Sequence, residues 1–310
     1  MNGQPQLILT SGEPLPGRTP HSSLRRRTGY HRIRRGVFVR ESNWTTLTPS
    51  QQHLLEARAA DAMSGLPNVW FSGITAAVIL GLPLICDWPM PVHQTILGAT
   101  GGRGGPGLIR HWTGTPPPAT VVNGLRVTNV DRTVLDLGRF ESVEAGVVAG
   151  DYAIRHLGLT QRELNQEVGN LTGRWGVARA RTVAAKVDGL SGSVGETRSR
   201  LRFPLIGVPA PTLQQPFEDE DGLIGYADFW WPEYGVIGEF DGRVKYEAAE
   251  YLNQRSGGDA LWAEKHREDR LRALGHIVAR WTWADLYDLH RLARILHRAG
   301  LPVSSRWILA

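Results

Sequence analysis

The chain has 310 residues, of which 41% are hydrophobic and 21% are charged, and its formal net charge at pH 7 is +5. This length and composition exclude a largely disordered chain and predict two or three folded domains. The sequence lacks an apolar stretch long enough to cross a bilayer and a recognisable signal peptide, and its single cysteine, Cys86, excludes an intrachain disulfide. We therefore expect a cytoplasmic protein without a membrane partner.

Charge is distributed unevenly along the chain. Residues 1–50 contain eight arginines and two acids, residues 201–250 contain three basic residues and ten acids, and residues 251–310 contain ten basic residues and six acids. This asymmetry predicts basic surfaces around a local acidic site. The acidic stretch "FEDEDG" (217–222) is typical of a solvated hairpin tip, whereas three other acids, Asp228, Glu239 and Asp241, lie in apolar sequence and need another explanation.

The first segment, residues 1–48, is strongly basic. Within it, "HRIRRGVFV" predicts a short hairpin with a glycine at the turn. A basic helix followed by a basic hairpin is how a winged-helix protein presents positive charge to DNA phosphates. A disordered basic tail is the alternative interpretation. The candidate DNA contacts are Arg25, Arg26, Arg27, Arg32, Arg34 and Arg35.

Residues 49–185 are mostly helical in pattern. A capped helix is predicted over "TPSQQHLLEARAADAMSG", a short buried helix over "GITAAVILGLP", and further helices over "DRTVLDLGR" and "EAGVVAGDYAIRHLGLTQRELNQEV". Strands are predicted in "PVHQTIL" and in "VVNGLRVTNV", the latter a hairpin around Asn123-Gly124. The glycine-rich "ATGGRGGPG" lacks the Gly-Lys-Ser/Thr ending of a P-loop, so a plain loop is expected.

Four stretches in this order resemble the AbiEi family, the antitoxins of type IV toxin–antitoxin systems. They are "RIRRGVFVRE", "FSGITAAVILGLPL", "GLRVTNVDRTVLDLGR" and "AGDYAIRHLGLTQREL", and the resemblance covers about residues 20–168. It implies an N-terminal winged helix that binds DNA, and as partners a cognate toxin or a second copy of the chain. The stretch before residue 20 departs from this pattern, because it contains no convincing first helix.

The character of the sequence changes after a linker at 186–194, and a second domain is predicted over 195–310. A helix carrying Glu196 precedes strands in "TLQQPFE", "GYADFWW" and "YGVIGEFDG". Because side chains alternate along a strand, Glu239 and Asp241 share one face. If the two last strands pair, Asp228 joins them, and the preceding helix can bring Glu196 alongside.

Clustered carboxylates repel one another unless a cation holds them, and hard oxygen ligands favour Mg²⁺ or Mn²⁺. Such a metal generates hydroxide and stabilises charge on a phosphate. The predicted metal ligands are therefore Asp228, Glu239 and Asp241. The alternative is that these acids are solvated on an edge strand or are paired with nearby arginines.

The segment "EKHREDRLRALGHIVARWTWADL" adds a charged helix that stops at Gly275, a strand and a second amphipathic helix. The predicted fold class is thus multidomain α/β: a winged-helix-like and mostly helical N-terminal region precedes an α/β domain with a central mixed sheet flanked by helices. The acidic site lies at one end of that sheet.

This order, with "GETRSRLR", "ADFWWPEYGVIGEFDG" and "EKHREDRLRALGHIVARWTW", resembles the PD-(D/E)XK restriction-endonuclease-like superfamily over about residues 194–290, and within it the very-short-patch-repair endonucleases. The resemblance implies catalytic roles for Glu196 as the helix acid, and for Asp228 and Glu239 as the two strand acids. The lysine that the superfamily places two residues after the second acid is replaced here by Asp241.

Two lysines are candidates for the missing position, Lys245 and Lys265, and Lys245 is equally well explained as a solvated loop residue. Arg267 and Arg270 are candidate phosphate contacts, although ion pairs between residues four apart explain that helix without a function.

Two functional hypotheses follow. The first is a DNA-binding protein with a Mg²⁺-dependent endonuclease domain that serves defence, a toxin–antitoxin system or DNA repair. The second is a non-catalytic antitoxin-type transcriptional regulator that keeps an inactive nuclease fold, which the missing strand lysine supports. A basic interaction module that binds no nucleic acid is a third interpretation.

Overall fold

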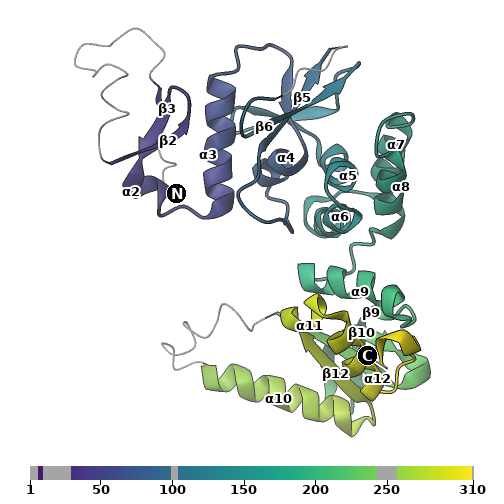
Figure 1. Ribbon diagram of the computed structural model, residues 1–310. Helices are drawn as coiled ribbons and strands as arrows, with labels where there is room; N and C mark the ends of the chain where they lie inside the picture. The colour runs from purple at the N-terminus through teal and green to yellow at the C-terminus, as the bar shows by residue number, and fades with distance from the viewer. Residues whose placement is uncertain (1–5, 10–28, 99–103, 243–256, 309–310) are drawn as a thin grey trace. The chain divides into compact units, whose positions relative to one another are not determined.

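The computed structural model describes residues 6–9, 29–98, 104–242 and 257–308 (Figure 1). The chain divides into two compact units, which we call unit 1 (Met1–Ala149 and Leu159–Lys186) and unit 2 (Gly150–Gly158 and Val187–Ala310). Arg25, Arg26, Arg27 and Lys245 lie outside the described residues. Over the described ranges, no helix is both long and apolar enough to span a membrane.

Unit 1 begins with the basic hairpin that the sequence predicted. Strand β2 (Tyr30–Arg34) pairs antiparallel with β3 (Val37–Arg40), and β1 (Ile8–Leu9) pairs with β3 on its other side. Gly36 in the turn has φ 81°, a left-handed conformation that glycine adopts without strain. A short helix α2 (Glu41–Trp44) follows the hairpin.

Two helices of unit 1 pack on a five-stranded sheet. The capped helix is confirmed as α3 (Pro49–Ala62), where Thr48 and Gln51 form a capping box, and the short buried helix is confirmed as α4 (Gly73–Leu80). Ala57 of α3 and Ala76 of α4 pack in one cluster with Phe71 and Val127 of the sheet. The sheet has the order β6-β5-β4-β8-β7, with β4 (Val69–Phe71), β5 (Val92–Leu97), β6 (Leu108–Thr113), β7 (Ala119–Val122) and β8 (Leu125–Thr128).

Residues 49–185 combine helices with a five-stranded sheet, and the strands predicted in "PVHQTIL" and "VVNGLRVTNV" are present as β5 and as the β7–β8 hairpin. The hairpin at Asn123-Gly124 is present, and both residues have the positive φ that its tight turn requires. Strands β4 and β6 were missed because the first has three residues and the second, "LIRHWT", has no clear alternation of apolar and polar side chains. The expected helices are α5 (Val130–Phe140), α6 (Val143–Leu157) and α7 (Gln161–Asn170), followed by α8 (Val177–Lys186).

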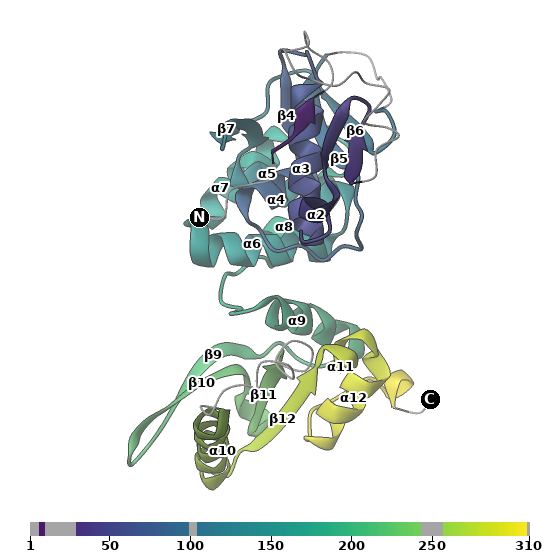
Figure 2. The ribbon, with the colours of Figure 1, turned by 90° about the vertical axis from the view of Figure 1, so that its left-hand side faces the viewer.

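Unit 2 contains a four-stranded mixed sheet with the order β12-β11-β10-β9, as the sequence predicted. Strands β9, β10 and β11 form an antiparallel meander, and β12 is parallel to β11. Figure 2 shows β9 and β10 as a long hairpin. The elements in chain order are α9 (Val194–Ile206), β9 (Thr212–Asp219), β10 (Gly222–Trp231), β11 (Val236–Asp241), α10 (Gly257–Ala273), β12 (Ile277–Thr282), α11 (Trp283–Tyr287) and α12 (Leu289–Arg298).

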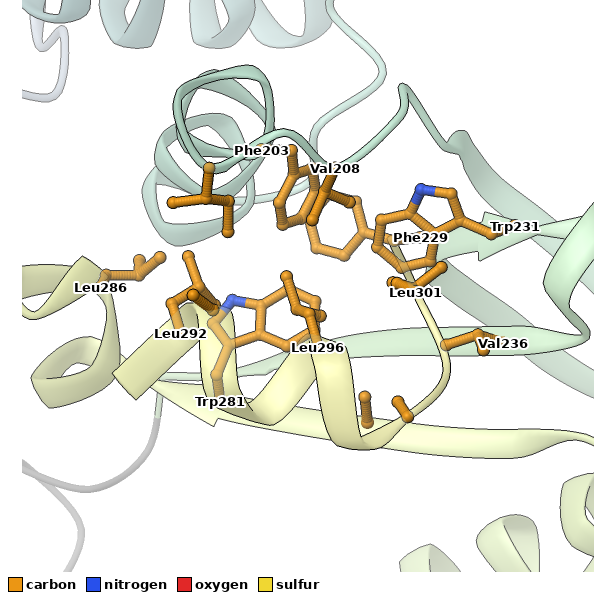
Figure 3. Packing of buried hydrophobic residues seen from close by; sticks show 14 residues of the cluster. Phe203, Val208, Phe229, Trp231, Val236, Trp281, Leu286, Leu292, Leu296 and Leu301 are labelled. Atoms are coloured by element: carbon orange, nitrogen blue, oxygen red, sulfur yellow. The ribbon is translucent and has the colours of Figure 1, made fainter. Parts of the chain in front are cut away.

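Each face of this sheet packs against different helices. On one face, Phe203 of α9 and Leu296 of α12 contact a cluster that includes Trp231 and Trp281 (Figure 3). On the other face, Leu271 of α10 packs in a cluster with residues of the three meander strands. Trp231 and Trp281 are 2% and 1% exposed, so both indole rings belong to the core of unit 2.

Gly238 in β11 leaves room for these two indole rings. A Cβ atom at this position would lie 2.6 Å from Trp281 Cη2 and 2.8 Å from Trp231 Cζ3. We predict that Gly238→Ala lowers the free energy of unfolding of unit 2 by about 1–3 kcal/mol, the usual cost of overpacking a core. Urea unfolding followed by tryptophan fluorescence measures the change. Gly242→Ala is the matched control, since its Cβ would meet its nearest neighbour, Phe240, at an ordinary 3.5 Å; equal effects of both substitutions would contradict the prediction.

Candidate functional site

Glu239 of β11 lies on the sheet face that packs against α10. Ile237 of β11 belongs to the cluster around Leu271 of α10, and alternation along the strand places Glu239 on the same face. Val236 and Phe240 contact the opposite cluster, on the side of α9 and α12. The side chains of β11 therefore alternate between the two faces as expected. The strand lies inside the sheet rather than at its edge.

Asp228 of β10 is the most strongly perturbed of these acids. It is half-buried, and its Oδ2 accepts a hydrogen bond from the backbone N–H of Phe240 at 2.9 Å. Burial, together with the negative charges of Glu196 and Glu239, raises the pKa of Asp228 to about 7. At neutral pH the group is thus close to half protonated, which is unusual for a carboxyl group and typical of functional sites.

Glu196 is placed near Asp228 by the start of α9. It is 8% exposed, and its Oε2 accepts hydrogen bonds from the Gly192 N–H at 2.7 Å and from Gln214 Nε2 at 2.8 Å. The preceding residue, Gly195, has no side chain, and a Cβ there would lie 1.8 Å from a carbon of the Phe240 ring. The close approach of α9 to β11, which brings Glu196 to the site, therefore requires glycine at this position.

Glu239 is held by two arginines. Its side chain is almost fully buried; Oε1 accepts a hydrogen bond from Arg267 of α10, and Oε2 accepts from Arg280 Nε at 3.0 Å and pairs with Arg280 Nη2 at 2.8 Å. Arg280 is the residue of β12 that lies opposite Glu239 in the parallel register. Arg280 Nη1 also pairs with Glu268 of α10 at 3.0 Å. The alternative interpretation of the sequence was that these acids pair with nearby arginines. It describes the observed contacts of Glu239.

Sequence reasoning did not find Arg280 or Gln214. The one signal for Arg280 was its position in the middle of the otherwise apolar strand "HIVARWTW", where an unpaired charge is costly. Gln214 carried no signal in the sequence, although its φ of 50° marks it as a backbone exception in β9.

The other residues predicted for the site in unit 2 lie in different surroundings from these acids. Lys265 is exposed on α10, and within the described part of the chain no hydrogen bond or ion pair joins it to the three acids. Arg270 pairs with Asp219 of β9. Asp241 is half-buried at the end of β11, opposite Thr282. Among the described residues, no group of three His, Cys, Asp or Glu side chains is arranged to hold a metal ion.

The arginines of the unit 1 hairpin fall into two groups. Arg32 and Arg35 are exposed, whereas Arg34 is half-buried and donates to the carbonyl oxygen of Gly107 at 2.9 Å. Burial lowers the pKa of Arg34, and the acid Glu56 partly offsets this effect. Arg32 and Arg35 are therefore the predicted hairpin arginines, among the described residues, that remain accessible to a phosphate, and Arg40 at the end of β3 is exposed as well.

Comparison with known proteins does not supply a function. No family model matches the chain. Two uncharacterized proteins of Mycobacterium tuberculosis, one from strain CDC 1551 and one from strain H37Rv, are 27% identical to it over 157 residues, which is 51% of this chain and 55% of each relative. The chain thus spans about half the length of the curated relatives that it matches, and any function must be argued from the site itself.

The raised pKa of Asp228 makes the stability of unit 2 depend on pH. Its pKa in the folded state lies above the ordinary value of 3.8, so the stabilising effect of the bound proton is complete at low pH and is lost as the pH rises to about 7. Asp228→Asn cannot ionise. We predict that the free energy of unfolding of this variant, relative to wild type, increases by about 2 kcal/mol between about pH 5 and pH 8. Urea unfolding in EDTA at several pH values measures the difference, and a difference independent of pH would contradict the assignment.

Proposed function

We propose that unit 2 is a Mg²⁺- or Mn²⁺-dependent endonuclease domain that hydrolyses phosphodiester bonds in DNA. The observation that carries the proposal is that the start of α9 and strands β10 and β11 bring Glu196 and Glu239 close enough to Asp228 for their charges to act on it. Glu196 and Glu239 raise the proton affinity of Asp228, and a divalent cation relieves such repulsion between carboxylates. The order of elements, a helix, an acid-bearing meander, a helix and a strand, supports the resemblance to PD-(D/E)XK endonucleases.

The donor chemistry of the site fits a hard divalent cation. Carboxylate oxygens of Asp228 in β10 and Glu239 in β11, with Asp241 at the end of β11, would hold the ion. When bound, the metal supplies activation of water and stabilisation of the charge on the phosphate. Arg267 and Arg280 now neutralise Glu239; once a cation shares that carboxylate, their guanidinium groups can contact a phosphate in place of the absent strand lysine.

Cleavage of DNA tests this proposal directly. We predict that the wild-type protein cleaves supercoiled plasmid or single-stranded DNA with Mg²⁺ or Mn²⁺, and that Asp228→Asn and Glu239→Gln each lower the rate by about 100-fold or more, the scale for loss of one group that stabilises transition-state charge. Gel electrophoresis over a time course measures the rates. The matched control is Asp288→Asn at the start of α12, because Asn caps a helix as well as Asp does. Cleavage that survives in all variants would indicate a contaminating nuclease.

A second candidate function is a DNA-binding regulator whose nuclease fold is inactive. The observation that favours it is that both oxygens of Glu239 are occupied by Arg267 and Arg280, while Asp241 stands in the position of the strand lysine. Absence of cleavage by every form, together with intact DNA binding and a pH dependence of stability that Mg²⁺ does not change, would select this candidate.

DNA binding by unit 1 is common to both candidates, and we propose that the exposed hairpin arginines contact phosphates. Replacing both Arg32 and Arg35 by Gln should make the DNA-binding constant less sensitive to salt. The negative slope of its logarithm against the logarithm of salt concentration should become shallower by about 2, because each lost phosphate contact removes about 0.9 of the slope. Fluorescence anisotropy with duplex DNA at several salt concentrations measures this slope. Arg291→Gln with Arg294→Gln, exposed on α12, is the matched control. An unchanged slope would place the DNA contacts elsewhere.

A further inference from the structure

Unit 1 contains a pocket that the proposed function does not use. Its volume is about 330 Å³. The walls combine two histidines, an acid, two large aromatic rings and apolar side chains, and the residues that matter are His93, His111, Phe140, Glu141 and Trp175. These side chains come from β5, β6, the end of α5 and the segment before α8.

The aromatic wall is built of nearly parallel rings. His111 stacks on Phe140 with ring centroids 3.8 Å apart and an angle of 12°, and Phe140 and Trp175 are 5.9 Å apart at 10°. Trp175 is 66% exposed, although the Arg179 guanidinium lies over its ring at 5.0 Å from the centroid. An exposed, oriented tryptophan at a pocket rim offers a stacking surface for another flat ring.

The polar groups of the pocket are neutral hydrogen-bonding groups. His93 Nδ1 lies 3.3 Å from His111 Nε2, and burial lowers the pKa of each histidine to about 4, so both are uncharged at neutral pH. His93 is 3% exposed, and its Nε2 has no hydrogen-bond partner among the described residues. Because either ring can donate to the other, the His93 Nε2 atom can be a donor or an acceptor, depending on the tautomer.

Glu141 adds an acceptor at the same pocket. Burial raises the pKa of its carboxyl group, and the charge of Arg179 partly offsets this. A carboxyl acceptor beside an aromatic wall favours ligands that carry N–H donors.

We propose that this pocket binds a neutral planar heteroaromatic group, a nucleobase with an exocyclic amino group. Trp175, which Phe140 and His111 hold in place by stacking, offers its exposed surface to the ring, the amino group donates to Glu141, and the histidine pair satisfies a polar atom of the ring edge. This combination of stacking and edge recognition is how proteins bind unpaired bases. The base can belong to a free nucleoside or to single-stranded nucleic acid, and the proposal does not depend on the nuclease activity of unit 2.

Alternative ligands are less well matched to the pocket. Two histidines can bind a transition metal, but the described residues contain no third His, Cys, Asp or Glu that completes a metal site. Burial also raises the pKa of the Cys86 thiol to about 11, with smaller contributions from Glu141 and Asp87, so this thiol does not supply a thiolate ligand at neutral pH.

Binding of defined probes to the full-length chain tests the proposal. Saturation-transfer difference NMR and calorimetry are carried out with adenosine, cytidine, thymidine and a single-stranded DNA of mixed sequence. We expect adenosine or cytidine to bind more tightly than thymidine, and Trp175→Ala to weaken that binding by about fivefold or more, in line with the contribution of one stacked base. Tighter binding of the oligonucleotide than of any nucleoside identifies nucleic acid as the source of the base.

The control is Trp112→Ala. Trp112 follows His111 in β6, so its side chain lies on the opposite face of the strand, and its substitution should leave binding unchanged. Glu141→Gln serves as a second variant and should remove the preference for bases with an amino group over thymidine. The proposal is overturned if no probe binds at millimolar concentration, if Trp175→Ala binds as tightly as wild type, or if Zn²⁺ alone perturbs the His93 and His111 resonances.

Discussion

Three carboxyl groups at one end of the unit 2 sheet cannot all be charged in a poorly hydrated place without compensating positive charge. The structure meets this constraint in two ways: Arg267 and Arg280 neutralise Glu239, while Asp228, between Glu196 and Glu239, has a pKa raised to about 7. The position of α10, which carries Arg267, and the pairing of β12 with β11, which places Arg280, are both consistent with this balance. A bound cation would change this balance of charges. The same residues therefore fit the proposals of both an active and an inactive nuclease site.

The opposite face of the sheet holds these charges in position by close packing. Trp231 and Trp281 fill the space over Gly238, and the Phe240 ring takes the place of a side chain at Gly195. Two glycines thus set how near β11 lies to its neighbours and how near α9 lies to β11. The arrangement of these acids depends on this packing, because a shift of α9 would move Glu196 away from Asp228.

Unit 1 presents two surfaces with different chemistry. The β2–β3 hairpin exposes Arg32 and Arg35, which suit phosphates, while the pocket beside Trp175 is aromatic and carries neutral histidines, which suit a base. A phosphate and a base both belong to a nucleotide strand, so the surfaces proposed for unit 1 are chemically compatible with one kind of ligand. Each is tested separately, since salt dependence reports the first and nucleoside selectivity the second.

Local patterns in the sequence were sufficient for the features that depend on neighbouring residues. The capping residues at Thr48, the turn at Asn123-Gly124 and the sharing of a face by Ile237 and Glu239 all follow from short-range geometry. The meander of unit 2 and the helices around it were predicted for the same reason. The partners of Glu239 were decided by the tertiary structure, because Arg280 reaches it only through the register of two parallel strands joined by a long crossover. The pocket could not be predicted from the sequence either, because the packing of α5 and α8 brings Phe140 and Trp175 together. Contacts between residues distant in sequence leave no periodic pattern.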